Sequence, residues 1–168
     1  MNQAHRLFLL LLSGLLSSCS FGPTTWHYQY ERGKTAVLHG PYAVPPANLP
    51  PRVLAAVHAG NQIAGRPYKY GGGHRSFMDN GYDCSGAVSY VLRGAGLLAR
   101  PSTSNAFRKW GSSGDGKHIT VYARKGHTFM EVAGLRFDTG YNGDGTGPHW
   151  TTRSRPIKGF RARHFPGL

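Results

Sequence analysis

Apolar side chains recur at helical intervals in two places along this chain. The first pattern follows Pro51, which is tolerated in the first turn of a helix, and ends before Pro67. The second begins at Cys84 and ends near Gly94 or Gly96. The apolar positions of the two patterns are Val53, Leu54, Val57, Ile63 and Ala64, then Val88, Tyr90, Val91 and Leu92. We therefore predict two helices, and a short third helix that carries Phe107 and Trp110.

Beyond His118 the period of the pattern changes from helical to alternating. Residues 119–124, 128–132, 135–138 and 159–163 alternate apolar and polar side chains, as half-buried strands do. Helices that precede a run of antiparallel strands are typical of an α+β fold. The sequence contains 24 Gly and 11 Pro in 168 residues, which argues against a helical bundle.

The N-terminus has the form of an export signal. Residues 1–18 combine Arg6 with an apolar run at 7–12 that is too short to span a bilayer of about 30 Å. The segment ends Leu16-Ser17-Ser18-Cys19, which resembles the lipobox of bacterial lipoproteins. The resemblance implies that Cys19 carries acyl chains such as palmitate and anchors the protein in the cell envelope. A plain secretory signal that ends in cysteine is the alternative.

The domain boundaries follow from these signals. We predict a signal peptide at 1–18, a lipidated and Pro-rich tether at 19–51, and a compact domain at 52–168. Trp26, Tyr28 and Tyr30 alternate with polar residues, which indicates either an edge strand or a docked arm. Ser20 is unlike an inner-membrane retention signal, so we expect attachment to the outer membrane, facing the periplasm.

Basic residues dominate the charge. Lys and Arg outnumber Asp and Glu by 20 to 7, for a net charge of +13. Export makes nucleic acid an unsuitable partner, so we expect attraction to anionic polymers of the cell wall. The densest basic cluster, at 151–163, is either a docking patch or a solvated edge.

Cys84 is the candidate nucleophile. With Cys19 acylated it is the one unmodified thiol, so no intramolecular disulfide can form. Asp83 before it can cap the helix, and the positive helix N-terminus favours a thiolate. The alternative is a buried cysteine that serves as a small apolar residue. Its neighbours Asp83, Ser85 and Gly86 are not core residues, which favours the nucleophile.

A hairpin places a base and a carboxylate on one face. With Ala133-Gly134 as a two-residue turn, Met130, Val132, Leu135 and Phe137 form a core face. His127 and Asp138 lie on the opposite, polar face, where the carboxylate can hold the imidazole in one tautomer. On that face Glu131 and Arg136 are expected to form a modest surface pair.

A metal site made from Cys84, His127, Asp138 and His149 is disfavoured. The chain has no His-x-x-x-His, no Cys-x-x-Cys and no close ligand pair of the kind that zinc uses. We therefore expect neither a metal nor another cofactor.

Three motifs together resemble the NlpC/P60 family of papain-like cell-wall cysteine peptidases. They are Tyr68-x-Tyr70-Gly71-Gly72, then Asp83-Cys84-Ser85-Gly86-Ala87-Val88 on a helix, then Gly126-His127 on a strand. The resemblance covers about residues 52–139 and implies a nucleophile-bearing helix packed on an antiparallel β-sheet. It assigns the nucleophile to Cys84, the base to His127 and an oxyanion-supporting hydroxyl to Tyr68, and it leaves Tyr70 to packing.

The sequence departs from the family pattern in three respects. The loop between Gly73 and Asp83 is long, and the Pro-Gly-Asp segment before the histidine strand is absent. The third polar residue, often His in the family, is Asp138 here, with His149 as the rival. We favour Asp138 on the hairpin argument.

These observations lead to a functional hypothesis. We expect a lipid-anchored cysteine hydrolase that cleaves amide bonds in peptidoglycan stem peptides. Family preference suggests the bond between a D-glutamyl residue and the diamino acid. One alternative is an envelope lipoprotein that binds wall peptides without turnover. Another is an acyl transferase that uses the same Cys84 and His127 pair.

Overall fold

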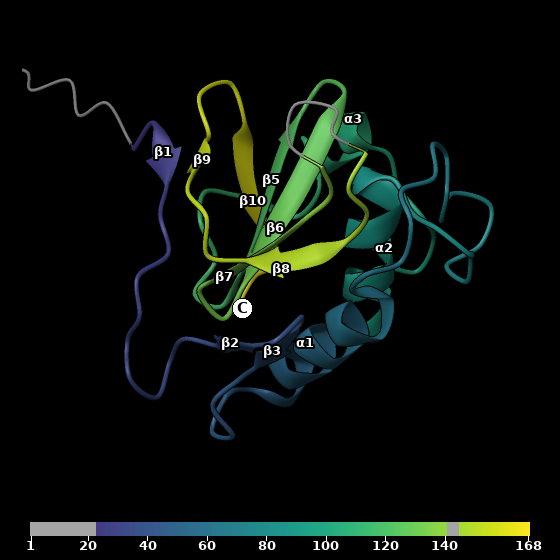
Figure 1. Ribbon diagram of the computed structural model, residues 1–168. Coiled ribbons are helices and arrows are strands. Elements are labelled where there is room, and N and C mark those ends of the chain that lie inside the picture. The colour runs from purple at the N-terminus through teal and green to yellow at the C-terminus, as the bar shows by residue number, and fades with distance from the viewer. Residues whose placement is uncertain (1–22, 141–144) are drawn as a thin grey trace, which may run out of the picture.

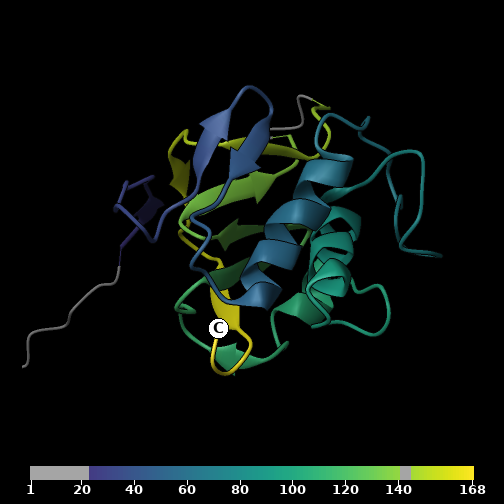
Figure 2. The same cartoon turned by 90° about the horizontal axis from the view of Figure 1, so that it is seen from below.

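A six-stranded antiparallel sheet carries helices on one face and an N-terminal arm, residues 23–34, on the other. The computed structural model describes residues 23–140 and 145–168, so the predicted signal peptide and Cys19 lie outside the described residues. Figures 1 and 2 show α1 and α2 side by side against the sheet, with β1 on the far side. The α+β fold with a nucleophile-bearing helix on an antiparallel sheet is confirmed.

In the described residues the helices follow one another, between an N-terminal group of strands and a later group of strands. The helices are α1 (Pro51–Ile63), α2 (Cys84–Gly94) and α3 (Ser104–Phe107). The N-terminal strands are β1 (Thr25–Trp26), β2 (Val37–His39) and β3 (Tyr42–Val44). The later strands are β4 (Ser112–Ser113), β5 (Ile119–Arg124), β6 (His127–Val132), β7 (Leu135–Asp138), β8 (His149–Thr151), β9 (Arg155–Pro156) and β10 (Arg161–His164). In the main sheet the strand order is β4-β10-β5-β6-β7-β8.

The two long helices begin and end where the sequence predicts. Pro51 occupies the first turn of α1, and α2 begins at Cys84 behind its N-cap, Asp83. Their apolar stripes pack on the sheet and form the core between the two layers, with Val53, Val57, Val88, Val91 and Leu92 all at most 1% exposed. Among the described residues, no helix has the length and apolar character needed to cross a membrane.

The central hairpin has the predicted register. Met130 pairs with Phe137, Glu131 with Arg136 and Val132 with Leu135. Ala133 and Gly134 at the turn have φ of 48° and 73°, the two positive values that a type I′ turn requires. This register puts His127 at the start of β6 and Asp138 at the end of β7.

The far face of the hairpin is buried, which corrects the expectation of a solvated polar face. Arg136 is 4% exposed and Phe129 is fully buried. Phe129 forms a second apolar cluster with Trp26 and Tyr122, packed on the side of the sheet that the helices do not cover. Glu131 and Arg136 are register partners as expected, but the expectation of a surface pair is wrong, because the arm covers this face and Arg136 is buried.

Residues 23–50 are part of the compact unit and not a free tether. β1 pairs with β9, and the β2–β3 hairpin is fastened to α1 by the Asn61 amide, which bonds both backbone groups of Ala43 at 2.9 Å. The N–H of Ala36 donates to the carbonyl of Ala133 at 2.7 Å. The Pro-rich composition favours extended backbone, but these contacts hold the segment against the domain. The packed unit therefore begins before residue 52, earlier than the sequence predicts.

Trp26 provides a test of how firmly the arm is docked. Its side chain is 5% exposed and its indole N–H donates to Glu131 at 2.6 Å. We expect Trp26→Ala to lower the free energy of unfolding by about 3 kcal/mol, because a buried ring and a partly buried hydrogen bond are lost together. Urea denaturation measures this. Tyr30→Ala, on the same arm but 61% exposed, is the matched control and should change stability by less than about 0.5 kcal/mol.

Candidate active site

Cys84 is held at the N-terminus of α2 by a network centred on Asp83. The carboxylate of Asp83 accepts the N–H of Gly86 at 2.8 Å and the hydroxyl of Ser85 at 3.1 Å. Its second oxygen accepts the N–H of Gly71 at 3.1 Å. The N-cap therefore fixes both the first turn of the helix and the glycine-rich loop beside it.

The glycine-rich loop approaches α2 so closely that side chains are excluded. A Cβ on Gly86 would overlap the carbonyl oxygen of Gly72, and a Cβ on Gly72 would overlap that of Gly81. The Gly-Gly and Ser-Gly steps that the sequence singles out are thus required by backbone packing next to the cysteine.

Gly86→Ala should show this requirement. The added methyl group meets backbone rather than a flexible side chain, so either the loop or the first turn of α2 must move. We expect a loss of about 3 kcal/mol in the free energy of unfolding, measured by urea denaturation. Gly40→Ala is the control: its φ is +59° with open space around it, so only the left-handed backbone penalty of about 1 kcal/mol applies. Equal losses for the two variants would contradict the packing argument.

His127 and Asp138 meet as the hairpin predicts. The Nε2 atom of His127 lies 3.0 Å from Oδ1 of Asp138, whose side chain is 1% exposed. With the Nε2 proton donated to this carboxylate, Nδ1 of a neutral ring is the acceptor that is left for a proton. The pair therefore has the arrangement of a base and the group that orients it.

The sulfur of Cys84 lies against the start of β6. The backbone N–H of Thr128, the residue after His127, is close enough to lower the pKa of the thiol, and the charge of Asp138 is close enough to raise it. Cys84 itself is only partly buried. The fold thus joins His127 to Asp138 and places Cys84 near Thr128 and within the electrostatic reach of Asp138, with the three residues carried by α2, β6 and β7.

The thiol is more weakly acidic than its position on the helix suggested. Burial is the largest influence and raises the pKa of Cys84 above its ordinary value, and Asp83 and Asp138 raise it further. Backbone N–H groups of Thr128 and Ser85 lower it in part. The expected effect of the helix N-terminus is therefore outweighed, and a thiolate at neutral pH requires a base that accepts the proton.

A short backbone bridge to Tyr82 holds Tyr68 near Cys84. Tyr68 pairs with Tyr82 in a parallel bridge, in which Lys69 N–H donates to Tyr82 at 3.3 Å. Burial raises the pKa of the Tyr68 hydroxyl, and the nearby charges of Cys84 and Asp83 raise it further, so it remains a hydrogen-bond donor at neutral pH. Tyr70, which the sequence assigned to packing, is 92% exposed, and that assignment is wrong.

His149, the rival third residue, pairs with Asp138 in the β7–β8 register. Its Nδ1 atom, however, lies 2.9 Å from the carbonyl of Gly147 in its own loop. Of the two candidates for the third residue, Asp138 is therefore the one that contacts His127.

Sequence reasoning missed His74, Arg136 and Arg155. Nε2 of His74 lies 3.0 Å from both Asp83 and Ser85, so the long loop after Gly73 reinforces the N-cap. Arg155 belongs to the basic cluster at 151–163 but is 2% exposed, so neither a solvated edge nor a docking patch describes it. No local pattern distinguishes it from its exposed neighbours.

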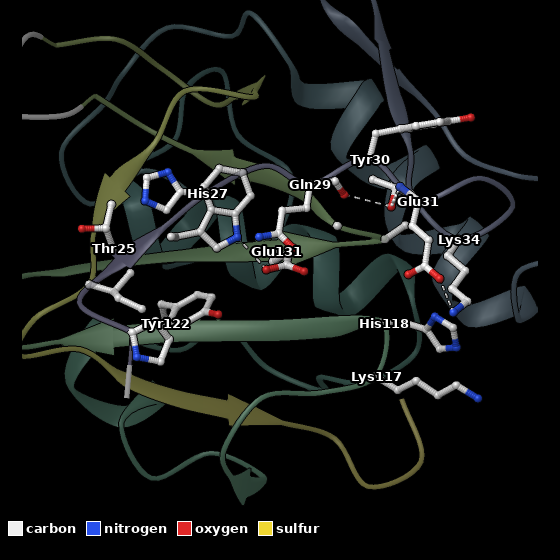
Figure 3. Close-up of a pocket in the computed structure, with 16 residues that line it drawn as sticks. Thr25, His27, Gln29, Tyr30, Glu31, Lys34, Lys117, His118, Tyr122 and Glu131 are labelled. Carbon is white, nitrogen blue, oxygen red and sulfur yellow. Dashed lines mark hydrogen bonds and ion pairs between the residues drawn. The ribbon is translucent and has the colours of Figure 1, made fainter. Parts of the chain in front are cut away.

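A cavity of about 800 Å³ lies between the arm and the sheet, away from Cys84. Arm residues from Thr25 to Lys34 line one side, and Tyr122 and Glu131 belong to the sheet side (Figure 3). Burial raises the pKa of Glu131. Within the described part of the chain, no group of three or more His, Cys, Asp or Glu side chains is placed to hold a metal ion.

Residues 65–120, one third of the chain, match the model of the NlpC/P60 family. The NlpC/P60 resemblance is confirmed. The matched NlpC/P60 segment contains Tyr68 and Cys84, whereas His127 and Asp138 lie beyond it. A search of curated proteins finds no match.

Solved structures similar to this chain include a peptidoglycan hydrolase and an NlpC/P60 family protein. The peptidoglycan hydrolase RipB from Mycobacterium tuberculosis has 19% sequence identity and a TM-score of 0.51, with 72% of this chain and 68% of RipB covered. This likeness supports the fold. An NlpC/P60 family protein from Bacillus cereus has 16% identity and a TM-score of 0.48, with 67% of this chain covered. The chain spans 40% of the length of that protein.

Proposed function

We propose that this protein is a cysteine hydrolase that cleaves amide bonds in peptidoglycan stem peptides. The observation that carries the proposal is the hairpin, which holds His127 on Asp138 and brings Thr128 and Asp138 close enough to shift the pKa of Cys84. The NlpC/P60 match and the fold shared with the peptidoglycan hydrolase RipB support the substrate class. A net charge of +13 favours binding to anionic wall polymers.

The reaction proceeds through a thioester. His127 accepts the thiol proton of Cys84, and the sulfur attacks the amide carbonyl. The Tyr68 hydroxyl and the N–H of Cys84 stabilise the tetrahedral oxyanion, since the first N–H groups of a helix have no intrahelical acceptor. The C–N bond then breaks, and the imidazolium of His127 returns its proton to the leaving amine.

Deacylation repeats the same steps with water. His127 takes a proton from water as the water oxygen attacks the thioester carbonyl. The C–S bond then breaks, and the imidazolium returns its proton to the departing sulfur. A carboxylic acid and the Cys84 thiol are released, so the protein ends as it began. Asp138 orients the His127 ring throughout both halves of the reaction.

The proposal includes export and anchoring. The sequence at 16–19 supports acylation of Cys19, and we propose attachment to the outer membrane with the domain facing the periplasm. Because residues 23–50 are docked on the domain, only the few residues after Cys19 would separate the anchor from the folded unit.

Digestion of purified sacculi tests the activity. The full chain is incubated with sacculi, and the soluble fragments are identified by mass spectrometry. We expect fragments with a new amino group and a new carboxyl group inside the stem peptide. Sacculi that bind protein but release no fragments would indicate a non-catalytic binding lipoprotein. A product joined to an added amine, in place of the free acid, would indicate acyl transfer.

A further inference from the structure

From the described residues Asp138 receives four hydrogen bonds, and two of them come from arginines. Its Oδ1 atom accepts from Nε2 of His127 at 3.0 Å and from the N–H of Thr139 at 2.9 Å. Its Oδ2 atom accepts from Arg136 at 3.0 Å and from Arg155 at 2.6 Å. The oxygen that faces the imidazole is thus separate from the oxygen that faces the guanidinium groups.

Both arginines are buried among aromatic side chains, so water does not screen their charges. Arg136 is 4% exposed, and its guanidinium lies 5.7 Å from the ring centre of Trp26. Arg155 is 2% exposed and lies 4.9 Å from the ring of Phe129 and 5.6 Å from that of Phe160. Phe160 in turn meets the His127 ring edge-on at 6.3 Å. Such cations hold their geometry more firmly than surface arginines do.

The N-terminal arm holds this arrangement in place. Arg155 lies on β9, which pairs only two residues with β1, and its partner there is Trp26. The same Trp26 covers Arg136 and bonds Glu131. The carboxylate that orients His127 is therefore fixed by residues from the arm, β7 and β9.

We propose that Arg136 and Arg155 are positioning residues, which aim Asp138 at His127 and offset its negative charge next to the sulfur of Cys84. This inference rests on the proposed function for the roles of Cys84 and His127. It explains how a full carboxylate can serve in this position: two cations on its far oxygen balance a charge that would otherwise oppose the thiolate.

The electrostatic part follows from the groups around the sulfur. Asp83 from the N-cap and Asp138 from β7 disfavour a thiolate, and Tyr68 on the loop is a further titratable group near the sulfur. In the proposed function, His127 on β6 is the base that faces it. Removing one guanidinium leaves the charge of Asp138 less balanced. The pKa of Cys84 should then rise further, because a nearby negative charge favours the neutral thiol.

The pH dependence of Cys84 alkylation tests this independently of any substrate. Iodoacetamide is added to the full-length folded protein at a series of pH values, and modification of the Cys84 peptide is followed by mass spectrometry. We expect Arg155→Met to move the midpoint upward by at least about 0.5 pH unit. Arg155→Lys keeps the charge and should stay within about 0.2 unit of wild type. Arg153→Met, an exposed arginine two residues away, is the matched control and should not move it.

Arg136→Met applies the same test to the arginine on β7. It replaces Arg155→Met if that variant does not fold. Midpoints that coincide with wild type in the methionine variants, while thermal stability falls, would overturn the proposal and leave the arginines a structural role alone. If the midpoints shift but sacculi are never hydrolysed, the positioning holds and the proposed function fails. The two failures are thus distinguishable.

Discussion

Cys84→Ala is expected to lower kcat/KM for hydrolysis of peptidoglycan stem peptides by at least about 10⁴-fold. The sulfur is the atom that forms the covalent bond to substrate in the proposed reaction, and alanine provides nothing to replace it. Binding to sacculi should persist, because Cys84 is partly buried and contributes little contact surface. Release of soluble fragments measures the first quantity, and cosedimentation with sacculi measures the second.

The second cysteine of the chain provides the matched control. Cys19 is assigned to the anchor, so Cys19→Ser should hydrolyse a soluble stem peptide at the wild-type rate while membrane association is lost. Hydrolysis that continues unchanged in Cys84→Ala would remove Cys84 from the mechanism.

His127→Ala is expected to lower kcat by about 10³-fold. Burial raises the pKa of the Cys84 thiol. In the proposed mechanism the sulfur therefore gives its proton to the imidazole at neutral pH. Two measurements should therefore change together: hydrolysis of a stem peptide, and the rate at which iodoacetamide modifies Cys84 at pH 7. Above the pKa of the thiol the alkylation rates of variant and wild type should converge, because hydroxide then removes the proton.

Controls for this variant separate the base from other histidines. His58 is exposed on α1, with its ring near Gln62, and His58→Ala should leave both rates unchanged. Asp138→Ala should lower kcat more than His149→Ala does, because His127 is held by Asp138 and the His149 ring bonds Gly147. A larger effect from His149 would reverse the assignment of the third residue.

Local signals explain why part of this site can be predicted from the sequence. Pro51 and Asp83 mark helix starts, and the alternating residues on each side of Ala133-Gly134 fix the hairpin register. The register alone puts His127 and Asp138 within reach of each other. The residues that form each of these elements lie close together in the sequence. Local side-chain patterns are therefore enough to predict the elements.

The remaining features depend on contacts between distant segments. β1 and β9 have two residues each, too few for any period to appear, yet their pairing places Trp26 over the far face of the sheet. Once that face is covered, Arg136 and Arg155 become buried cations. Without knowledge of the arm, the same arginines look like surface charge.

The ionisation of Cys84 shows the same distinction. Its place at the start of a helix is a local property, and it favours a thiolate. Burial and the carboxylates of Asp83 and Asp138 are tertiary properties, and they favour the thiol. The tertiary influences dominate and raise the pKa of Cys84, which reverses the sequence-based expectation that the thiolate is favoured.

The central claim is that the sulfur of Cys84 forms a covalent bond to the wall peptide. Rapid acid quenching of the full-length protein with excess stem peptide, followed by intact-mass and peptide-mapping mass spectrometry, measures this directly. We predict an adduct with the mass of the acyl half of the substrate, located on Cys84 and absent from Cys84→Ala. An adduct of that mass on another residue, or the same adduct in Cys84→Ala, would contradict the account.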